Sequence, residues 1–128
     1  MPQSTHLAIS PTLVGALVTQ TREAATARLV ATREMAADER GLVHGGFTFG
    51  LADFAAMCAV NHPNVVLGSA ATKFLAPVRV GEEMLARATL AQEGGRKRLV
   101  DVTVRVGERL VFSGEFTCFV LDEHVLDA

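Results

Sequence analysis

GGFTFGLADFAAMCAV, residues 45–60, differs in kind from the rest of the chain. Two glycines open this segment, small residues recur along it, and Asp53 is its one charged residue. Sixteen residues make a helix about 24 Å long. Because the segment is apolar nearly all round, we predict a buried central helix rather than a surface helix. Pro63 lies in the polar run 61–64 and cannot continue the helical hydrogen bonds, so the helix is expected to end before it.

On the carboxyl side of this helix the apolar pattern changes to a period of two, which is typical of strands. The predicted strands cover residues 65–75, 84–92, 99–106 and 109–120. Pro77 and Gly81 follow the first of them, Gly94-Gly95 predicts a turn, and Gly107-Glu108 suits a two-residue hairpin. Tight turns between successive strands indicate an antiparallel sheet with one covered face.

On the amino side, residues 12–21 and 27–35 are predicted as two strands joined by a turn around Glu23–Thr26, although their alanines fit a helix equally well. Residues 38–41 form a polar, Gly-ended loop, and residues 1–10 are expected to be loosely held. The sum is an α+β domain, in which one long central helix is wrapped by an antiparallel sheet of about six strands.

The chain has 128 residues and a formal net charge of −2, with 49% hydrophobic and 20% charged residues. This length fits a single domain covering residues 1–128, and the composition is that of a soluble globular protein. No nucleic-acid partner, membrane span or secretory signal is expected. The two cysteines, Cys58 and Cys118, lie 60 positions apart without a companion motif, so both are predicted to be small buried hydrophobes in a cytoplasmic protein.

Asp53 is an anomaly on the predicted helix. Its neighbours at three and four positions are Phe49, Gly50, Ala56 and Met57, and no basic residue lies within one turn. Burying a lone carboxylate costs several kcal/mol unless something pairs with it, and proteins accept such a cost most often at working sites. Asp53 is therefore a candidate functional residue. The alternative is a structural tie, in which its carboxylate hydrogen-bonds a backbone group or a basic strand residue.

His44, Gly45 and Gly46 stand at the predicted start of the helix. Glycines let a ligand approach the backbone closely, and the first amides of a helix have no internal acceptor and carry a partial positive charge. Such amides are suited to a carbonyl oxygen or a developing oxyanion. His44 is either a ligand contact or a residue that braces the loop.

The sequence offers no sign of a metal or a cofactor. The four histidines are scattered without ligand spacing. No glycine-rich phosphate loop follows a strand, and no Gly-x-Ser-x-Gly elbow is present.

The run Gly41-Leu42-Val43-His44-Gly45-Gly46, followed by Leu51-Ala52-Asp53, resembles the signature of the hot-dog-fold acyl-CoA thioesterases. The similarity is greatest to the phenylacetate-pathway branch, which is related to the 4-hydroxybenzoyl-CoA thioesterases. Residues 73–77 with Gly81-Glu82 also resemble the strand that follows the helix in that family. The resemblance covers about residues 12–120 and implies the hot-dog fold.

This resemblance implies hydrolysis of an acyl-CoA thioester to a free acid and CoA, without a cofactor. The amide at the Gly45 position polarises the thioester carbonyl, and the carboxylate at the Asp53 position acts as nucleophile or as general base for water. His44 and Gly46 belong to the same motif. Many relatives carry Asn six residues before the motif histidine; Asp38 stands there in this chain, and an ionised carboxylate accepts but does not donate a hydrogen bond.

Further residues are candidates for contact with the substrate. Relatives place a Ser or Thr near the carboxylate after the helix, and Ser69 and Thr72 are the candidates here; the alternative for both is an ordinary strand residue. The basic groups are Lys73 and Arg79, which flank the end of the same strand, and the run Arg96-Lys97-Arg98 after the predicted turn. Clustered basic side chains hold phosphates, as the CoA moiety would require, although solvated charge at a strand edge is the alternative.

Gly45 and Asp53 are eight positions apart, which is about 12 Å along a helix axis. An amide and a carboxylate that act on one thioester must lie within a few ångström of each other. One straight helix does not bring both groups to the same thioester, whereas two antiparallel helices across a twofold axis do. We therefore predict a homodimer with two equivalent, shared sites. A dimer of dimers is the alternative assembly.

Two other functions remain open on the sequence. A non-catalytic acyl-CoA or acyl-ligand binding module of the same fold is one of them, because Asp38 departs from the family pattern. A hydratase or dehydratase of the same fold is the other; it needs a histidine–acid pair, and His44 and Asp53 are nine residues apart. A binding module would release no thiol from a panel of acyl-CoAs, whereas a thioesterase would. A hydratase would add water to an enoyl-CoA.

Overall fold

The computed structural model describes residues 2–128. Its central element is the helix α1 (Gly45–Val60), with the bounds predicted from the sequence. At its carboxyl end Asn61 adopts a left-handed backbone conformation with φ of 52°, and its amide donates to the carbonyl of Met57. This cap satisfies one of the last helical carbonyls, so the helix ends there and Pro63 follows in the next loop.

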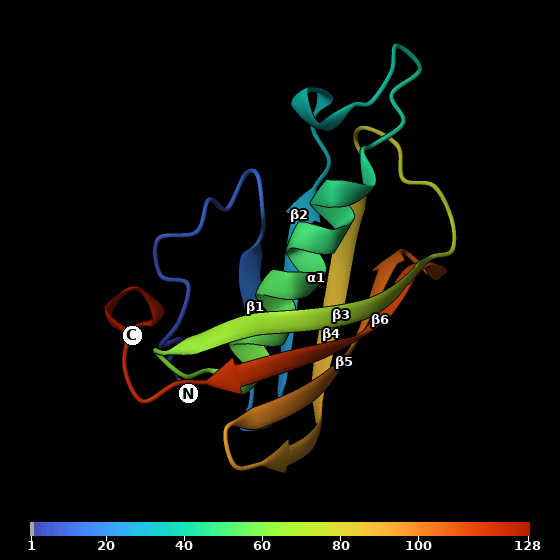
Figure 1. Ribbon diagram of the computed structural model, residues 1–128. Helices are drawn as coiled ribbons and strands as arrows, with labels where there is room; N and C mark the ends of the chain where they lie inside the picture. Colours follow the sequence, from blue (N-terminus) through green and yellow to red (C-terminus); the bar gives the residue numbers. More distant parts are fainter. Residues whose placement is uncertain (1) are drawn as a thin grey trace.

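Six antiparallel strands curve around the helix (Figure 1). They are β1 (Ala16–Gln20), β2 (Ala24–Val30), β3 (Val65–Phe74), β4 (Glu83–Gly94), β5 (Lys97–Val106) and β6 (Arg109–Val120). Their order across the sheet is β1-β2-β4-β5-β6-β3, and two 3₁₀ turns, η1 (Arg33–Met35) and η2 (Val125–Asp127), complete the fold. One helix against a six-stranded antiparallel sheet confirms the predicted hot-dog fold.

The core lies between α1 and the concave face of the sheet. On β5, the alternation predicted from the sequence is observed: Val100, Val102 and Val104 are buried against the helix, whereas Asp101 and Arg105 are exposed. Many other core positions along the helix and on β2 and β4 are alanines, which allow the helix to lie close to the sheet. The two cysteines, at positions 58 and 118, are free and buried, as predicted.

The structure corrects the predicted bounds on the amino side. The sequence predicts a turn around Glu23–Thr26 and a strand over residues 27–35, but β2 already begins at Ala24 and ends at Val30, where η1 follows soon after. Ala25 and Ala27 face the helix as an inward alternation of small residues and pair with Ala88 and Ala86 of β4. Their tertiary packing overrides the weak local propensity of alanine.

The sheet is open and has two edge strands. β1 forms one edge and β3 the other, and β3 pairs with β6 along its other side. Six residues of β3 are exposed: Gly68, Ser69, Ala70, Ala71, Lys73 and Phe74. An exposed edge of this length is a template for pairing with another strand.

The segment before β1 lies against the carboxyl end of the helix. Ser4 donates from its backbone amide to the Asn61 side chain over 2.7 Å and from its hydroxyl to the Asn61 carbonyl over 2.8 Å. Asn61 in turn donates to the Pro2 carbonyl. These bonds join residues 2–4 to the helix cap. A loosely held start, as predicted for residues 1–10, would lack such contacts. Within residues 2–128, no helix is long and apolar enough to cross a membrane.

Candidate active site

The start of α1 presents two backbone amides without acceptors. Within residues 2–128, neither Gly45 nor Gly46 donates its N–H to another backbone or side-chain atom, and His44 makes no side-chain cap. Unpaired amides at a helix N-terminus carry a partial positive charge and are directed along the axis away from the helix. They can therefore donate hydrogen bonds to a carbonyl oxygen.

A cavity of about 440 Å³ lies at these amides. Its walls are mostly apolar and come from the helix start, the loop after β3 and the strand β6. They are formed by Val43, Gly45, Thr48, Phe74, Leu75, Ala76, Pro77, Val78 and Val111. A side-chain Cβ at Gly45 would lie 3.1 Å from the Phe74 ring, a tight contact that the ring would have to move to relieve. The cavity is suited to an apolar group attached to a carbonyl.

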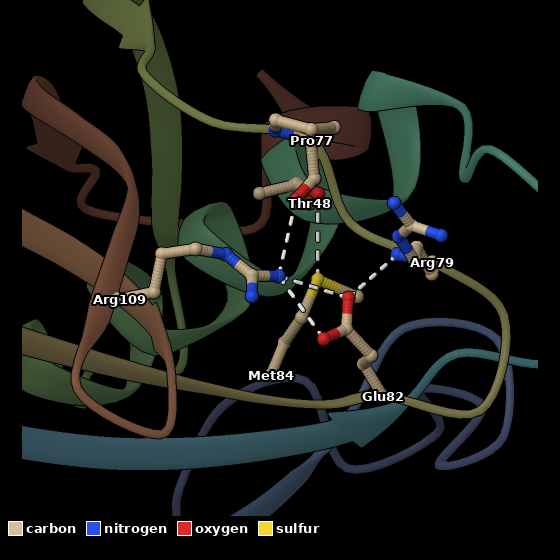
Figure 2. Close-up of polar contacts among 6 residues, drawn as sticks. All are labelled: Thr48, Pro77, Arg79, Glu82, Met84 and Arg109. Atoms are coloured by element: carbon tan, nitrogen blue, oxygen red, sulfur yellow. Dashed lines mark hydrogen bonds and ion pairs between the residues drawn. The ribbon is translucent and has the colours of Figure 1, made fainter.

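Thr48 is a cavity residue that the sequence reasoning missed. It is buried one helical turn after Gly45, and its hydroxyl donates to the sulfur of Met84 over 3.4 Å. Figure 2 shows this contact beneath Pro77. The signal that marks it in the sequence is a lone hydroxyl side chain on an otherwise apolar helix, at the position three residues after the first glycine.

An ion-pair cluster fixes the loop that forms one wall of the cavity. Figure 2 shows the guanidinium of Arg109 between Glu82 and Pro77. It donates to both Glu82 carboxylate oxygens, at 2.9 and 3.0 Å, and to the Pro77 carbonyl at 3.2 Å. The Arg79 amide also donates to Glu82, and this bond and the Arg109 guanidinium lower the pKa of the carboxyl. The loop is therefore anchored at both ends before any ligand binds.

Asp53 lies on a strip of the helix that the sheet does not cover. The partly or fully exposed residues of this strip are Gly46, Phe49, Gly50 and Asp53. One carboxylate oxygen of Asp53, Oδ1, is buried without a hydrogen-bond partner in the part of the chain described. Burial raises the pKa of Asp53 to about 6. A carboxyl in this state is a base whose pKa is close to neutral pH, and the alternative of a structural tie is not observed among residues 2–128.

The surroundings of Asp53 leave space for a ligand or a second chain. A Cβ built at Gly50, one turn before Asp53, meets no atom within 4 Å. The charge of Asp53 also acts on Cys118, which faces inward on β6: burial, and then this charge, raise the pKa of the thiol to about 12. Cys118 therefore stays protonated and is a poor nucleophile at neutral pH.

Within one chain, the helix separates the two main candidates. Gly45 and Asp53 are both on α1, eight residues and about 12 Å apart along the axis, and Asp53 does not line the cavity at Gly45. The other motif residues gather at the amino end. The His44 ring covers Gly46, whose Cβ would lie 3.0 Å from it, and contacts Phe47 edge-on with the ring centroids 6.2 Å apart.

Asp38 lies in the loop before the helix and organises that loop. Its Oδ1 accepts the backbone N–H groups of Arg40 over 2.9 Å and Leu42 over 3.1 Å. It lines a second cavity, next to the one at Gly45, rather than the first. Within one chain, its oxygen serves the backbone and is not directed at Asp53.

The strand candidates spread along the free edge of the sheet. Ser69 and Lys73 are exposed on β3, and Thr72 is half-buried with its methyl group facing Gly114 of β6. Ser69 and Lys73 therefore lie on the surface of this strand, where a second chain or a ligand can reach them.

The basic run lies at the β4–β5 hairpin, far from Gly45 in the same chain. Lys97 pairs with Phe119, which also pairs with Val66 at the start of β3, whereas Gly45 contacts Phe74 at the end of β3. Eight residues of strand separate the two ends, which is roughly 26 Å.

Ion pairs and hydrogen bonds restrain part of this basic run. Arg96 pairs with Asp122 and Arg98 with Glu93. Arg98 also donates to the carbonyls of Gly95 and Lys97. The exposed Lys97 has no ion-pair partner among residues 2–128. That same range contains no cluster of three or more side chains that would hold a metal ion.

Comparison with known proteins places the chain in a family. A family model described as the thioesterase superfamily matches residues 40–113. The chain is 48% identical over 119 residues to the methylthioribose-1-phosphate isomerase of Aquifex aeolicus, covering 92% of this chain and 26% of that protein. It is 34% identical over 86 residues to the transcription factor FapR of Shouchella clausii, covering 67% and 45%. The chain thus spans about a quarter to about half of these relatives.

Solved structures share the fold along nearly the whole chain. The crystal structure of protein PH1136 from Pyrococcus horikoshii matches with a TM-score of 0.98 and 48% identity, over 99% of this chain and 98% of that one. A mutant of the phenylacetic acid degradation protein PaaI from Thermus thermophilus matches with a TM-score of 0.79 and 26% identity, over 85% and 95%. Together with the family match over more than half of the sequence, these findings show that the chain belongs to the thioesterase superfamily, in its phenylacetate-degradation-like branch with the hot-dog fold.

Proposed function

We propose that this protein hydrolyses an acyl-CoA thioester to a free acid and CoA. The observation that carries the proposal is the pairing, on one buried helix, of unpaired amides at an apolar cavity with a single desolvated carboxylate. The amides of Gly45 and Gly46 are donors for the thioester oxygen, and Asp53 is a base with a pKa of about 6. Membership of the thioesterase superfamily supports the same reaction class.

In the proposed reaction the thioester carbonyl oxygen accepts a hydrogen bond from the Gly45 amide, which draws electron density from the carbonyl carbon. Asp53 removes a proton from a water molecule while the water oxygen attacks that carbon. The carbon–sulfur bond then breaks, and Asp53 returns the proton to the departing thiolate. The alternative is direct attack by Asp53 to form a mixed anhydride that water cleaves. A single turnover in ¹⁸O water followed by analysis of the protein distinguishes the two, because only the anhydride route can label the Asp53 carboxylate.

The proposed site is shared between two subunits. Gly45 and Asp53 of one helix do not reach the same thioester, whereas the edge strand β3 is free to pair with a second copy. An antiparallel pairing of two β3 strands sets the two helices antiparallel, with the Gly45 end of each beside Asp53 of the other. A dimer centred near Ala70 would also carry the Arg96–Arg98 hairpin of one chain to the Gly45 end of its partner. There it could contact the nucleotide of the substrate.

The test is thiol release from a panel of aliphatic and aromatic acyl-CoAs. Wild-type protein is expected to turn over at least one member, and Asp53→Asn is expected to lose kcat on the order of 10²-fold or more with the fold intact. The variant keeps the size of the side chain and removes the base. Turnover close to wild type in Asp53→Asn would remove Asp53 from the mechanism.

A non-catalytic acyl-CoA binding module is the second candidate, and the similarity to the transcription factor FapR favours it. In that case the protein binds acyl-CoA without thiol release. Calorimetric titration of the same acyl-CoA panel, run beside the assay, separates a protein that binds and cleaves from one that only binds.

A further inference from the structure

Two arginines, Arg40 and Arg79, line a second cavity beside the one at Gly45. This cavity has a volume of about 220 Å³ and is lined by Asp38, Arg40, Leu42, Pro77 and Arg79. Pro77 lines both cavities, so the two adjoin. Within residues 2–128, neither the Arg40 nor the Arg79 guanidinium has a carboxylate at ion-pair distance. The proposed reaction does not use either side chain.

Backbone hydrogen bonds hold the two arginines in place relative to each other. The loop before the helix and the loop after β3 form a short antiparallel ladder, in which Leu42 pairs with Arg79. On either side of this pair, Val43 donates to the Val78 carbonyl and Val80 donates to the Gly41 carbonyl, both over 2.9 Å. The walls of the cavity are therefore fixed before a ligand arrives, which lowers the entropic cost of binding.

Side-chain carboxylates hold the same two loops from either side. Asp38 accepts the Arg40 amide, and Glu82 accepts the Arg79 amide over 2.8 Å. Both acids thus bond the backbone of an arginine, and neither forms an ion pair with its guanidinium, although the charge of Arg79 also acts on Glu82 and helps to lower the pKa of that carboxyl. Glu82 is itself neutralised by Arg109.

The charge of this cavity favours an anion. The cavity is lined by two arginines and one carboxylate, Asp38, and it adjoins the cavity at Gly45, where the positive end of the helix dipole lies. Guanidinium groups match the geometry of phosphate oxygens and bind them through paired hydrogen bonds. A phosphate is therefore the anion that this arrangement fits.

We propose that Arg40 and Arg79 form a phosphate-binding site for the phosphate at the end of the pantetheine arm of CoA. The inference rests on the proposed function, because it takes the thioester to be held at Gly45. From there the arm leads out of the first cavity past Pro77 into the second. The basic hairpin at Arg96–Arg98 is then left for the ribose phosphate of the same molecule.

The experiment is a calorimetric titration with four ligands that add phosphate groups stepwise: pantetheine, 4′-phosphopantetheine, dephospho-CoA and CoA. Wild-type protein is expected to bind phosphopantetheine more tightly than pantetheine. Arg40→Ala and Arg79→Ala should each weaken binding of the three phosphate-bearing ligands on the order of tenfold at low salt, as for the loss of a charge-assisted hydrogen bond. Neither variant should change the affinity for pantetheine, and Arg79→Lys should retain part of the affinity.

The matched control is Arg87→Ala, since Arg87 is exposed on β4, lines neither cavity and has no ion-pair partner in the described chain. This variant should bind all four ligands as the wild type does. The inference is overturned if wild-type protein gains nothing from the first phosphate. It is also overturned if the arginine variants bind phosphopantetheine normally, or if they lose pantetheine equally. An effect seen with CoA but absent with dephospho-CoA assigns the arginines to the ribose phosphate and overturns the placement at the arm.

The titrations also separate this inference from the proposed function. Thiol release from an acyl-pantetheine reports the chemistry without any phosphate. If this release is normal while the arginine variants bind every ligand normally, the function stands and the phosphate site falls. If no thioester is cleaved while phosphate affinity still depends on Arg40 and Arg79, the site stands and hydrolysis falls.

Discussion

Asp53 is the residue on which the chemistry depends, and its isolation is visible in the sequence. A single acid among apolar helix residues indicates a functional group, and the structure adds that one of its oxygens is buried without a partner among residues 2–128. What sequence could not reveal is which face of the helix the sheet leaves open. That face depends on long-range packing, and it places Asp53 beside the open space at Gly50.

The raised pKa of Asp53 has a consequence for stability. Burial raises it from 3.8 to about 6, so the folded protein binds more protons than the unfolded chain between about pH 4 and 6. The free energy of unfolding therefore falls as pH rises through that window and stays lower above it. Asp53→Asn removes this loss of stability. Scanning calorimetry should therefore show that the Tm of the variant minus the Tm of wild type is larger at pH 8 than at pH 4. The same Tm difference at both pH values would contradict burial of the charged form.

Asp38 is predicted to act through the loop that it holds. An asparagine oxygen can accept the same two N–H groups, so Asp38→Asn should keep wild-type stability and kcat. Asp38→Ala leaves those groups without their acceptor and should lower the free energy of unfolding by about 1 kcal/mol. Chemical denaturation and steady-state kinetics on both variants provide the test. If asparagine impairs kcat as much as alanine does, the carboxylate charge itself takes part in the reaction.

At the scale of elements, the strength of the local pattern decides what sequence can predict. The helix is found at residues 45–60 because its apolar run and flanking breakers agree, and β5 follows a clean alternation. The predicted bounds of β2 are wrong because alanines fit a strand, a helix or a turn, and only the pairing with β4 selects the strand. The Arg40–Arg79 cavity is invisible in the sequence because its two loops are 39 residues apart and meet through tertiary hydrogen bonds.

The β4–β5 hairpin carries the element-scale prediction. Arg96→Ala and Arg98→Ala should raise KM for acyl-CoA with little change in kcat, because the hairpin contributes binding that is equal in ground and transition states. The rise should shrink at high salt, since exposed charges are screened. Initial-rate kinetics at two salt concentrations provide the measurement, with Arg87→Ala as the control. An unchanged KM in both hairpin variants would exclude these residues from CoA binding.

At the scale of the whole molecule, the proposed reaction requires two chains. Each chain supplies one set of amides and one carboxylate, placed at different heights on its helix, and the free β3 edge is the surface through which copies can pair. A dimer with twofold symmetry converts two incomplete half-sites into two complete ones. The structure of one chain thus explains why its own two candidate groups do not meet.

Complementation tests this shared site most directly. Gly45→Val and Asp53→Asn proteins, each inactive, are unfolded and refolded together, and heterodimer formation is confirmed by native mass spectrometry. Random pairing gives about half heterodimers, each with one intact site, so about a quarter of wild-type thiol release should return. Heterodimers that form and release no thiol would contradict the central claim that Gly45 of one subunit and Asp53 of the other act on the same thioester.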